Sequence, residues 1–217
     1  MSIATFNIGL SLLSSKKPSR FEQSCEGRRI LSLLEDRPLL ENDILKNENG
    51  RPYFSCGNAD FSVSHSRNMV TVSHVSGKSI HTACDIQLIK HRTNTTQIAE
   101  NFFTDSEKDY ILRNEKRFFE IWTLKECFLK LRGFSVFEMK NVPSFIYEGK
   151  FSDRQFSNVL SPPFTFFLYE LEDYSENQYM FAVCVEGEEQ SAPEIKWFSQ
   201  VFLPCGNIAK ITKTRNY

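Results

Sequence analysis

The sequence predicts an α+β fold, and three observations support this class. Residues 95–131 carry apolar side chains at helical spacing. Residues 69–86 form two strand-like runs around a tight reversal, and residues 164–171 and 179–185 predict a second antiparallel pair. Strands are therefore expected toward both ends of the chain, with helices in the middle.

The N-terminal elements follow from local patterns. Residues 3–10 carry apolar side chains that predict a first strand, and residues 21–35 place Ile and Leu at helical spacing until Pro38 ends the helix. Residues 47–52 form a polar turn that contains Gly and Pro, and residues 54–63 predict a short strand interrupted by polar residues.

The predicted hairpin places a carboxylate where its side chain could face a cleft. Residues 69–75 and 79–86 are expected to pair across Ser76-Gly77-Lys78. Asp85 then lies near the end of the second strand, where a sheet presents side chains to a cleft. Taken alone, Asp85 is equally an ordinary polar residue at a strand end.

The helical region contains three predicted helices. The first carries its apolar stripe between Ile98 and Phe103, the second begins at Thr104 with Glu107 at capping-box spacing, and the third covers about residues 117–131 and stops at Gly133. On the third helix the predicted buried stripe consists of Ile121, Leu124, Phe128 and Leu131. The opposite face, expected to line a cleft, carries Phe119, Trp122, Glu126 and Lys130. Glu126 and Lys130 could also form a simple i,i+4 ion pair worth about 0.3–0.5 kcal/mol.

Composition restricts the class of protein. The 217 residues include 26 basic and 27 acidic side chains, and the net charge of −1 argues against a nucleic-acid partner. No apolar run reaches the ~20 residues of a membrane span, and the N-terminus lacks the basic segment of a signal peptide. The six cysteines are widely spaced, so we expect reduced core residues of a cytoplasmic protein.

Five short motifs occur in a characteristic order. They are Gly50-Arg51-Pro52, Ser64-His65-Ser66, Ala83-Cys84-Asp85-Ile86-Gln87, Phe102-Phe103-Thr104-Asp105-Ser106-Glu107 and Trp122-Thr123-Leu124-Lys125-Glu126-Cys127-Phe128-Leu129-Lys130. This set resembles the 4′-phosphopantetheinyl transferases of the larger, monomeric, surfactin-type group. Two positions depart from the family pattern, because Ala83 replaces Gly and Gln87 stands where Glu is frequent.

The resemblance implies an α+β fold of two similar subdomains related by a pseudo-twofold, each an antiparallel sheet packed on a long helix. Residues 1–90 would form the N-terminal subdomain, which contributes Asp85 and the contacts to coenzyme A. Residues 91–217 would form the C-terminal subdomain with Glu107, Glu126, Lys130 and a tail after Pro193, to which no role is assigned.

The resemblance also implies a magnesium site. Asp85 and Glu126 would bind Mg²⁺, which prefers hard oxygen ligands and bridges phosphate oxygens. Gln87 would ligate the metal through its amide oxygen or through a water, with one negative charge fewer than a glutamate would supply.

Several residues are expected to bind coenzyme A. By resemblance, Lys130 would contact the diphosphate and Lys125 would lie near it. Ser64 and His65 would bind the 3′-phosphate, although the same residues could be a turn rich in hydroxyls. Gly50, Arg51 and Pro52 would border the adenine, with Arg51 on the 3′-phosphate. Further phosphate contacts are expected from Lys17, Arg20 and Arg28.

Glu107 matches the family's proposed general base, a role that contributes about 10²–10⁴-fold to a rate. The same residue is also explained as a helix cap. The implied reaction transfers phosphopantetheine from coenzyme A to a serine of an apo acyl or peptidyl carrier protein. Candidate docking residues are Phe102, Phe103 and the segment 113–117.

Two other functions remain open. The carboxylates could serve a magnesium-dependent phosphohydrolase, or the chain could be a catalytically silent module that binds coenzyme A or a carrier protein. His74, His81 and His91 show no metal-ligand spacing and are interpreted as ordinary strand or loop residues.

Overall fold

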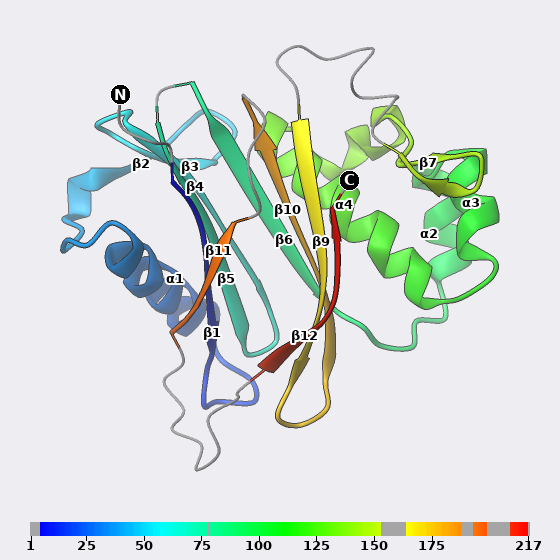
Figure 1. The fold of residues 1–217 in the computed structure, drawn as a ribbon, viewed down its shortest axis with the longest axis horizontal. Helices are drawn as coiled ribbons and strands as arrows, with labels where there is room; N and C mark the ends of the chain where they lie inside the picture. Colours follow the sequence, from blue (N-terminus) through cyan, green and yellow to red (C-terminus); the bar gives the residue numbers. More distant parts are fainter. Residues whose placement is uncertain (1–4, 78, 153–163, 188–192, 199–208, 217) are drawn as a thin grey trace.

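The computed structural model describes residues 5–77, 79–152, 164–187, 193–198 and 209–216. The chain is built in four layers, in which helix α1 (Arg20–Leu34) covers one sheet, a second sheet packs behind the first, and helix α4 (Lys116–Arg132) covers the second sheet (Figure 1). Each sheet therefore carries one long helix on its outer face, as the α+β prediction requires.

The first sheet contains both early and late segments of the chain. Its strands in spatial order are β11 (Glu194–Trp197), β1 (Phe6–Leu12), β5 (Met69–Ser76) and β4 (Ala59–Ser66). Strands β1, β5 and β4 are antiparallel, whereas β11 pairs with β1 in parallel. Strands β4 and β5 are joined by a tight turn at Arg67 and Asn68, where Arg67 has a φ of 56°.

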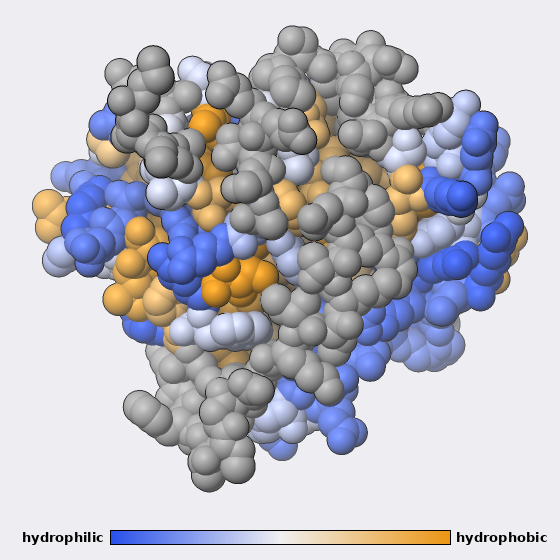
Figure 2. Space-filling view, viewed as in Figure 1, coloured by the Kyte–Doolittle hydropathy of each residue, from blue (hydrophilic) through white to orange (hydrophobic). Residues whose placement is uncertain are grey.

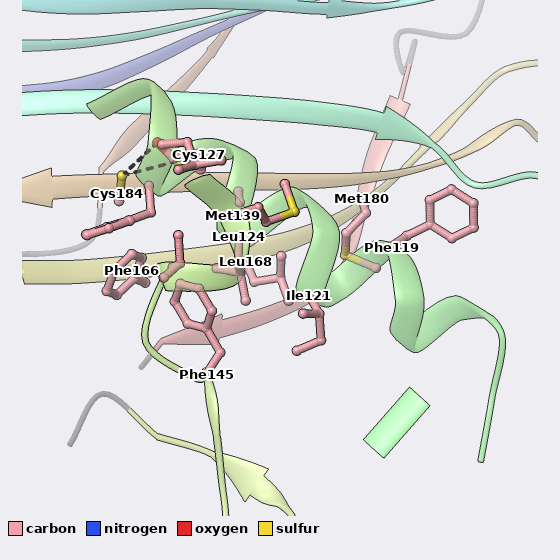
Figure 3. Packing of buried hydrophobic residues seen from close by; sticks show 14 of the residues in the cluster. Phe119, Ile121, Leu124, Cys127, Met139, Phe145, Phe166, Leu168, Met180 and Cys184 are labelled. Carbon is pink, nitrogen blue, oxygen red and sulfur yellow. Dashed lines mark hydrogen bonds between the residues drawn. The ribbon is translucent and has the colours of Figure 1, made fainter. Parts of the chain in front are cut away.

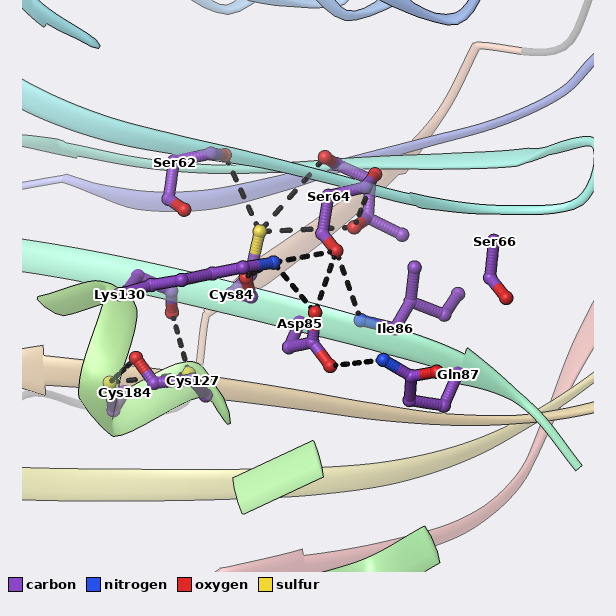
Figure 4. A network of polar contacts seen from close by, with 12 residues as sticks. Ser62, Ser64, Ser66, Cys84, Asp85, Ile86, Gln87, Cys127, Lys130 and Cys184 are labelled. Atoms are coloured by element: carbon purple, nitrogen blue, oxygen red, sulfur yellow. Dashed lines mark hydrogen bonds and ion pairs between the residues drawn. The ribbon is translucent and has the colours of Figure 1, made fainter. Parts of the chain in front are cut away.

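The second sheet is antiparallel throughout. Its strands in spatial order are β12 (Ala209–Asn216), β9 (Phe164–Asp173), β10 (Gln178–Glu186) and β6 (His81–Leu88). The pairing of β9 with β10 confirms the predicted antiparallel pair. Strand β6 lies at the edge of this sheet, beside β4 of the first sheet (Figure 4).

Three apolar cores separate the layers. One lies between α1 and the first sheet, where α1 approaches β1 so closely that a Cβ added at Gly9 would meet Ile30 Cγ2 at 2.2 Å. The second core lies between the two sheets. The third packs α4 and its neighbours against the second sheet, as Figure 3 shows, and includes the predicted stripe of Ile121, Leu124, Phe128 and Leu131.

The predicted hairpin of residues 69–86 is wrong. Strand β5 pairs with β4 and β1, whereas β6 pairs with β10 of the other sheet. Lys78, in the expected reversal, lies outside the described residues. The local pattern was misleading because β6 packs against apolar side chains of both cores, through Ala83 on one face and Ile86 on the other.

The boundary expected near residue 90 does not separate the two sheets. Strand β6 precedes it but belongs to the second sheet, and β11 follows it but extends the first sheet. The first sheet is also not purely antiparallel, because β11 runs parallel to β1. The tail after Pro193 therefore contributes one strand to each sheet, which its sequence did not indicate.

Shorter elements complete the fold. They are η1 (Glu41–Asp43), β2 (Ile44–Lys46), β3 (Pro52–Phe54), α2 (Thr95–Phe102), α3 (Asp105–Ile111), η2 (Val136–Asn141), β7 (Ile146–Tyr147) and β8 (Lys150–Phe151). Polar residues cover the part of the surface over α2 and α3 (Figure 2). The capping box at Thr104 and the C-cap at Gly133, whose φ is 68°, confirm two sequence predictions. None of the described helices combines the length and apolarity needed to cross a membrane.

The cysteines only partly follow the prediction of core residues. Cys84, Cys127 and Cys184 are buried, but Cys25 and Cys56 are exposed, and all five are free thiols. Cys205 lies outside the described residues. Polar segments around Cys25 and Cys56 explain their exposure.

Candidate active site

Asp85 is the centre of a polar cluster where β4, β6 and α4 meet. It lies on β6 and is 3% exposed. Its Oδ1 accepts hydrogen bonds from Ser64 Oγ at 2.9 Å and from Lys130 Nζ at 2.6 Å, and its Oδ2 accepts one from Gln87 Nε2 at 3.0 Å (Figure 4). Strands β4 and β6 and helix α4 therefore converge on one carboxylate.

Glu126, on α4, is a second carboxylate near enough to Asp85 for the two charges to interact. Burial, together with the nearby negative charge of Asp85, raises the pKa of Glu126 to about 6. No described residue donates a hydrogen bond to its carboxylate, and its predicted i,i+4 ion pair with Lys130 is not formed, because Lys130 binds Asp85 instead. A half-buried carboxylate beside another carboxylate, without a cationic partner of its own, is suited to share a cation.

The oxygen donors of this cluster fit Mg²⁺. Asp85, Glu126 and the amide oxygen of Gln87 are hard ligands of the kind that magnesium prefers. Among the residues described, no group of three or more His, Cys, Asp or Glu side chains could hold a metal ion, so the third donor would be Gln87. These three residues would hold the ion.

Lys130 supplies positive charge next to the carboxylates. Its side chain is 35% exposed and also donates to the carbonyl oxygen of Cys84 at 3.3 Å. Burial lowers the pKa of Lys130, but the neighbouring charges, above all Asp85, outweigh this effect, so the pKa is raised overall. The ammonium therefore stays charged and is partly open to an anionic ligand.

The positive charge of Lys130 also acts on His65. The pKa of His65 is lowered, first by partial burial and then by the positive charges of Lys130 and, more weakly, Arg20. The positive charges of Lys130 and Arg20 therefore reach His65 and disfavour its charged form. Lys17 is exposed, whereas Arg28 donates to the carbonyl oxygens of Leu39 and Leu40 and so holds the chain after α1.

Gly50, Arg51 and Pro52 line a cavity of about 240 Å³ together with Lys130. Its other lining residues are Asn49, Phe61, Ser62, Val63, Gly133 and Phe134. The cavity thus joins the predicted adenine-binding motif to the predicted phosphate-binding lysine.

Arg51 uses its guanidinium within the protein. It donates to Leu131 O at 2.9 Å, to Thr82 O at 3.0 Å and to Asp60 Oδ2 at 2.5 Å. These bonds join the residue 47–52 turn to the end of α4 and to β6. The geometry favours a role in holding the cavity wall over the expected contact with a 3′-phosphate.

This placement makes a testable prediction for Arg51→Lys. The variant loses part of the three-way contact, so we expect a loss of about 2 kcal/mol in the free energy of unfolding and a higher KM for coenzyme A. Its preference for coenzyme A over 3′-dephospho-coenzyme A should equal that of the wild type, measured as the ratio of kcat/KM values. Loss of that preference would instead assign Arg51 to the 3′-phosphate.

Glu107 and Lys125 form a separate buried pair. Both side chains are 0% exposed, and Lys125 Nζ lies 2.9 Å from Glu107 Oε2. Glu107 also accepts hydrogen bonds from the backbone amides of Thr104 at 2.9 Å and Phe145 at 3.0 Å. Burial lowers the pKa of Lys125, against the opposing effect of Glu107.

The pair therefore does not join the Asp85 cluster. Lys125 faces the interior about 140° around α4 from Lys130 by the helical period, which explains why it does not reach the predicted phosphate site. The role of Glu107 as a general base stays a prediction that its complete burial opposes.

The predicted carrier-docking residues differ in exposure. Phe103 is 6% exposed and belongs to the core, whereas Phe102 is half-buried beside Trp122. Arg113 is exposed, Lys116 pairs with Glu170, and Arg117 lies over the Tyr110 ring. Phe119, expected on the cleft face of α4, is 1% exposed and packs in the core.

The remaining histidines each lie beside a carboxylate. His74 and His91 contact Glu35 and Glu115, and His81 lies 3.4 Å from Asp60. Asp60 itself was missed from the sequence, although it binds Arg51 and accepts a hydrogen bond from Thr82 N. The sequence did contain a pattern that indicates Asp60. Residues 60, 62, 64 and 66 are all polar, and alternate residues of a strand lie on one face, so Asp60 belongs to the polar face that carries Ser64.

The chain was also compared with known proteins. The family profile described as the 4′-phosphopantetheinyl transferase superfamily matches residues 82–184, which include α4 and most of β6 and β10. A relative from Haemophilus influenzae is 30% identical over 131 residues, covering 58% of this chain and 55% of that protein. This chain thus spans only slightly more than half of the Haemophilus relative.

Two enterobacterial relatives carry the name 4′-phosphopantetheinyl transferase AcpT. The Salmonella typhi protein is 31% identical over 134 residues, covering 56% of this chain and 69% of that protein. The Escherichia coli K12 protein is 29% identical over 139 residues, covering 58% of this chain and 70% of that protein. The similarity to the Salmonella typhi protein and the match to the family profile show that the chain belongs to the 4′-phosphopantetheinyl transferase superfamily.

Proposed function

We propose that this protein transfers the 4′-phosphopantetheine group of coenzyme A to a serine of an apo acyl or peptidyl carrier protein, with Mg²⁺ as cofactor. The observation that carries the proposal is the contact of Asp85 on β6 with Lys130 on α4, with Glu126 on the same helix near enough for the charge of Asp85 to raise its pKa. Two carboxylates and an ammonium at such a point are suited to a divalent ion and a diphosphate.

The reaction is a phosphoryl transfer. The carrier serine oxygen would bond to the β-phosphorus of coenzyme A while the bond from that phosphorus to the bridging oxygen breaks. Adenosine 3′,5′-bisphosphate leaves with the bond electrons, and the serine proton is released. When bound, Mg²⁺ would neutralise charge on the diphosphate oxygens.

The side chains of this chain would position the reactants. Lys130 would bind the diphosphate and stabilise charge on the leaving phosphate, and one preorganised group of this kind contributes about 2.7–4 kcal/mol to lowering a barrier. His65 and Arg20 would hold the remaining phosphate. Residues 50–52 would border the adenine. They line the same cavity as Lys130.

We further propose membership of the larger, monomeric, surfactin-type group. Two four-stranded sheets with one long helix each occur within one chain, so both carboxylates come from the same molecule. The five free thiols among the described residues suit a reducing compartment, and we propose the cytoplasm.

One assay tests the function. The purified protein is incubated with coenzyme A, Mg²⁺ and an apo carrier protein, and the carrier is weighed by mass spectrometry. A gain of one phosphopantetheine per carrier, abolished by a chelator, is the expected result. Release of inorganic phosphate without a heavier carrier would identify a phosphohydrolase, and absence of any product would identify a binding module.

A further inference from the structure

Strands β4 and β6 meet through side chains rather than through a backbone ladder. Three oxygens on β4 accept hydrogen bonds from backbone amides of β6, and each partner lies 22 residues farther along the chain. The bonds run from Thr82 N to Asp60 Oδ2 at 2.9 Å, from Ile86 N to Ser64 Oγ at 3.2 Å and from Leu88 N to Ser66 Oγ at 2.9 Å. We call these three bonds the seam.

Ser64 is the seam residue that also reaches the candidate active site. Its hydroxyl donates to Asp85 Oδ1 at 2.9 Å and accepts from Ile86 N at 3.2 Å and from Lys130 Nζ at 3.0 Å (Figure 4). A serine hydroxyl offers one donor and two acceptor positions, so these three contacts use its full capacity. The hydroxyl therefore has no donor left for the phosphate contact that the sequence suggested.

The geometry has a direct consequence for the two charged groups. Asp85 Oδ1, Lys130 Nζ and Ser64 Oγ contact one another, and the Ile86 amide fixes Ser64 to the strand that carries Asp85. Ser64 and Asp85 are only 4% and 3% exposed, so water cannot replace the hydroxyl without rearrangement. Hydrogen bonds of this kind orient a ligating carboxylate.

We propose that Ser64 is a positioning residue, which holds the Asp85 carboxylate for the divalent cation and the Lys130 ammonium for the diphosphate. This inference rests on the proposed function, in which these two groups bind metal and coenzyme A. It assigns Ser64 to the organisation of the charged groups and leaves phosphate recognition to His65, Arg20 and Lys130.

The test compares Ser64→Ala with Ser66→Ala. Both variants lose a seam hydrogen bond to a β6 amide, but only Ser64 contacts Asp85 and Lys130. Binding of Mn²⁺ to the free protein, measured by electron paramagnetic resonance, is expected to weaken about 10–100-fold in Ser64→Ala and to stay at the wild-type value in Ser66→Ala. Ser64→Thr retains the hydroxyl and should restore most of the affinity. Thermal unfolding of each variant shows that the proteins compared are folded.

Kinetics with carrier protein provide the second readout. A positioning role predicts that Ser64→Ala lowers kcat about 10–100-fold, with a smaller change in KM for coenzyme A. If Ser64 bound the 3′-phosphate, Ser64→Ala would instead raise the KM for coenzyme A. With 3′-dephospho-coenzyme A, which lacks that phosphate, the variant and the wild type would then have the same KM. This second pattern would overturn the proposal.

The two proposals fail in different ways. If the wild type forms holo carrier protein while Ser64→Ala and Ser66→Ala bind Mn²⁺ equally well, the positioning role is wrong and the proposed function stands. If the wild type forms no holo carrier protein but Ser64→Ala alone weakens Mn²⁺ binding, the proposed function is wrong and the positioning role stands. If the wild type neither binds Mn²⁺ nor forms product, both are wrong.

Discussion

Replacing Asp85 by asparagine is expected to reduce kcat/KM for holo-carrier formation by at least about 10²–10³-fold, as removal of one preorganised charged group does in other enzymes. The change removes one of the two carboxylates that would hold the metal. It also removes the negative charge 2.6 Å from the Lys130 ammonium. Initial rates by mass spectrometry and Mn²⁺ binding to the free protein measure the two consequences separately.

A matched variant makes this result specific. Asp173→Asn removes a buried carboxylate of similar exposure from the turn between β9 and β10, where it accepts hydrogen bonds from Ser175 N and Asn177 N. Asp173→Asn is expected to affect stability but not Mn²⁺ affinity. Wild-type rates in Asp85→Asn, or equal losses of Mn²⁺ affinity in both variants, would refute the two-carboxylate site.

Breaking the Glu107–Lys125 pair is expected to cause the largest loss of stability. Both side chains are fully buried, so Lys125→Met leaves the Glu107 carboxylate without its cation in the interior. Removing one partner of such a pair costs about 3–5 kcal/mol, whereas replacing both by neutral groups costs much less. Chemical denaturation should therefore show a large loss in Lys125→Met and recovery in the double variant with Glu107→Gln.

The same double variant tests the role of Glu107 in transfer. If Glu107 only holds α3 and α4 together, the recovered protein should also recover its transfer rate. A stable double variant that forms no holo carrier protein would support the general base. Lys108→Met serves as the control, because its ion pairs with Glu100 and Asp105 are largely exposed and should contribute little to stability.

Sequence reasoning was most accurate where local patterns determine the structure. The stripe of α4, its end at Gly133 and the cap at Thr104 depend on residues within one or two turns, and all three are confirmed. The motif order also placed Asp85 and Lys130 in one site, because those residue types and spacings occur together in the family.

Long-range packing accounts for the failures. Strand β6 resembled the second half of a hairpin because its nearest strand in sequence is β5, yet its partner β10 lies about 100 residues later. The sequence around Glu107 predicts the start of α3. It does not predict that the segment around Phe145 packs against this helix and donates a hydrogen bond to Glu107. Phe119 lies on the predicted cleft face by angle alone, but the helix is enclosed on more than one side.

The seam between β4 and β6 has a consequence for how such a protein can change over generations. Peptide groups are common to every residue, so an ordinary sheet ladder survives most substitutions. Here the hydrogen bonds from β6 amides to β4 depend on the side chains of Asp60, Ser64 and Ser66. Single substitutions can therefore adjust how firmly the two halves are held together, without altering either sheet.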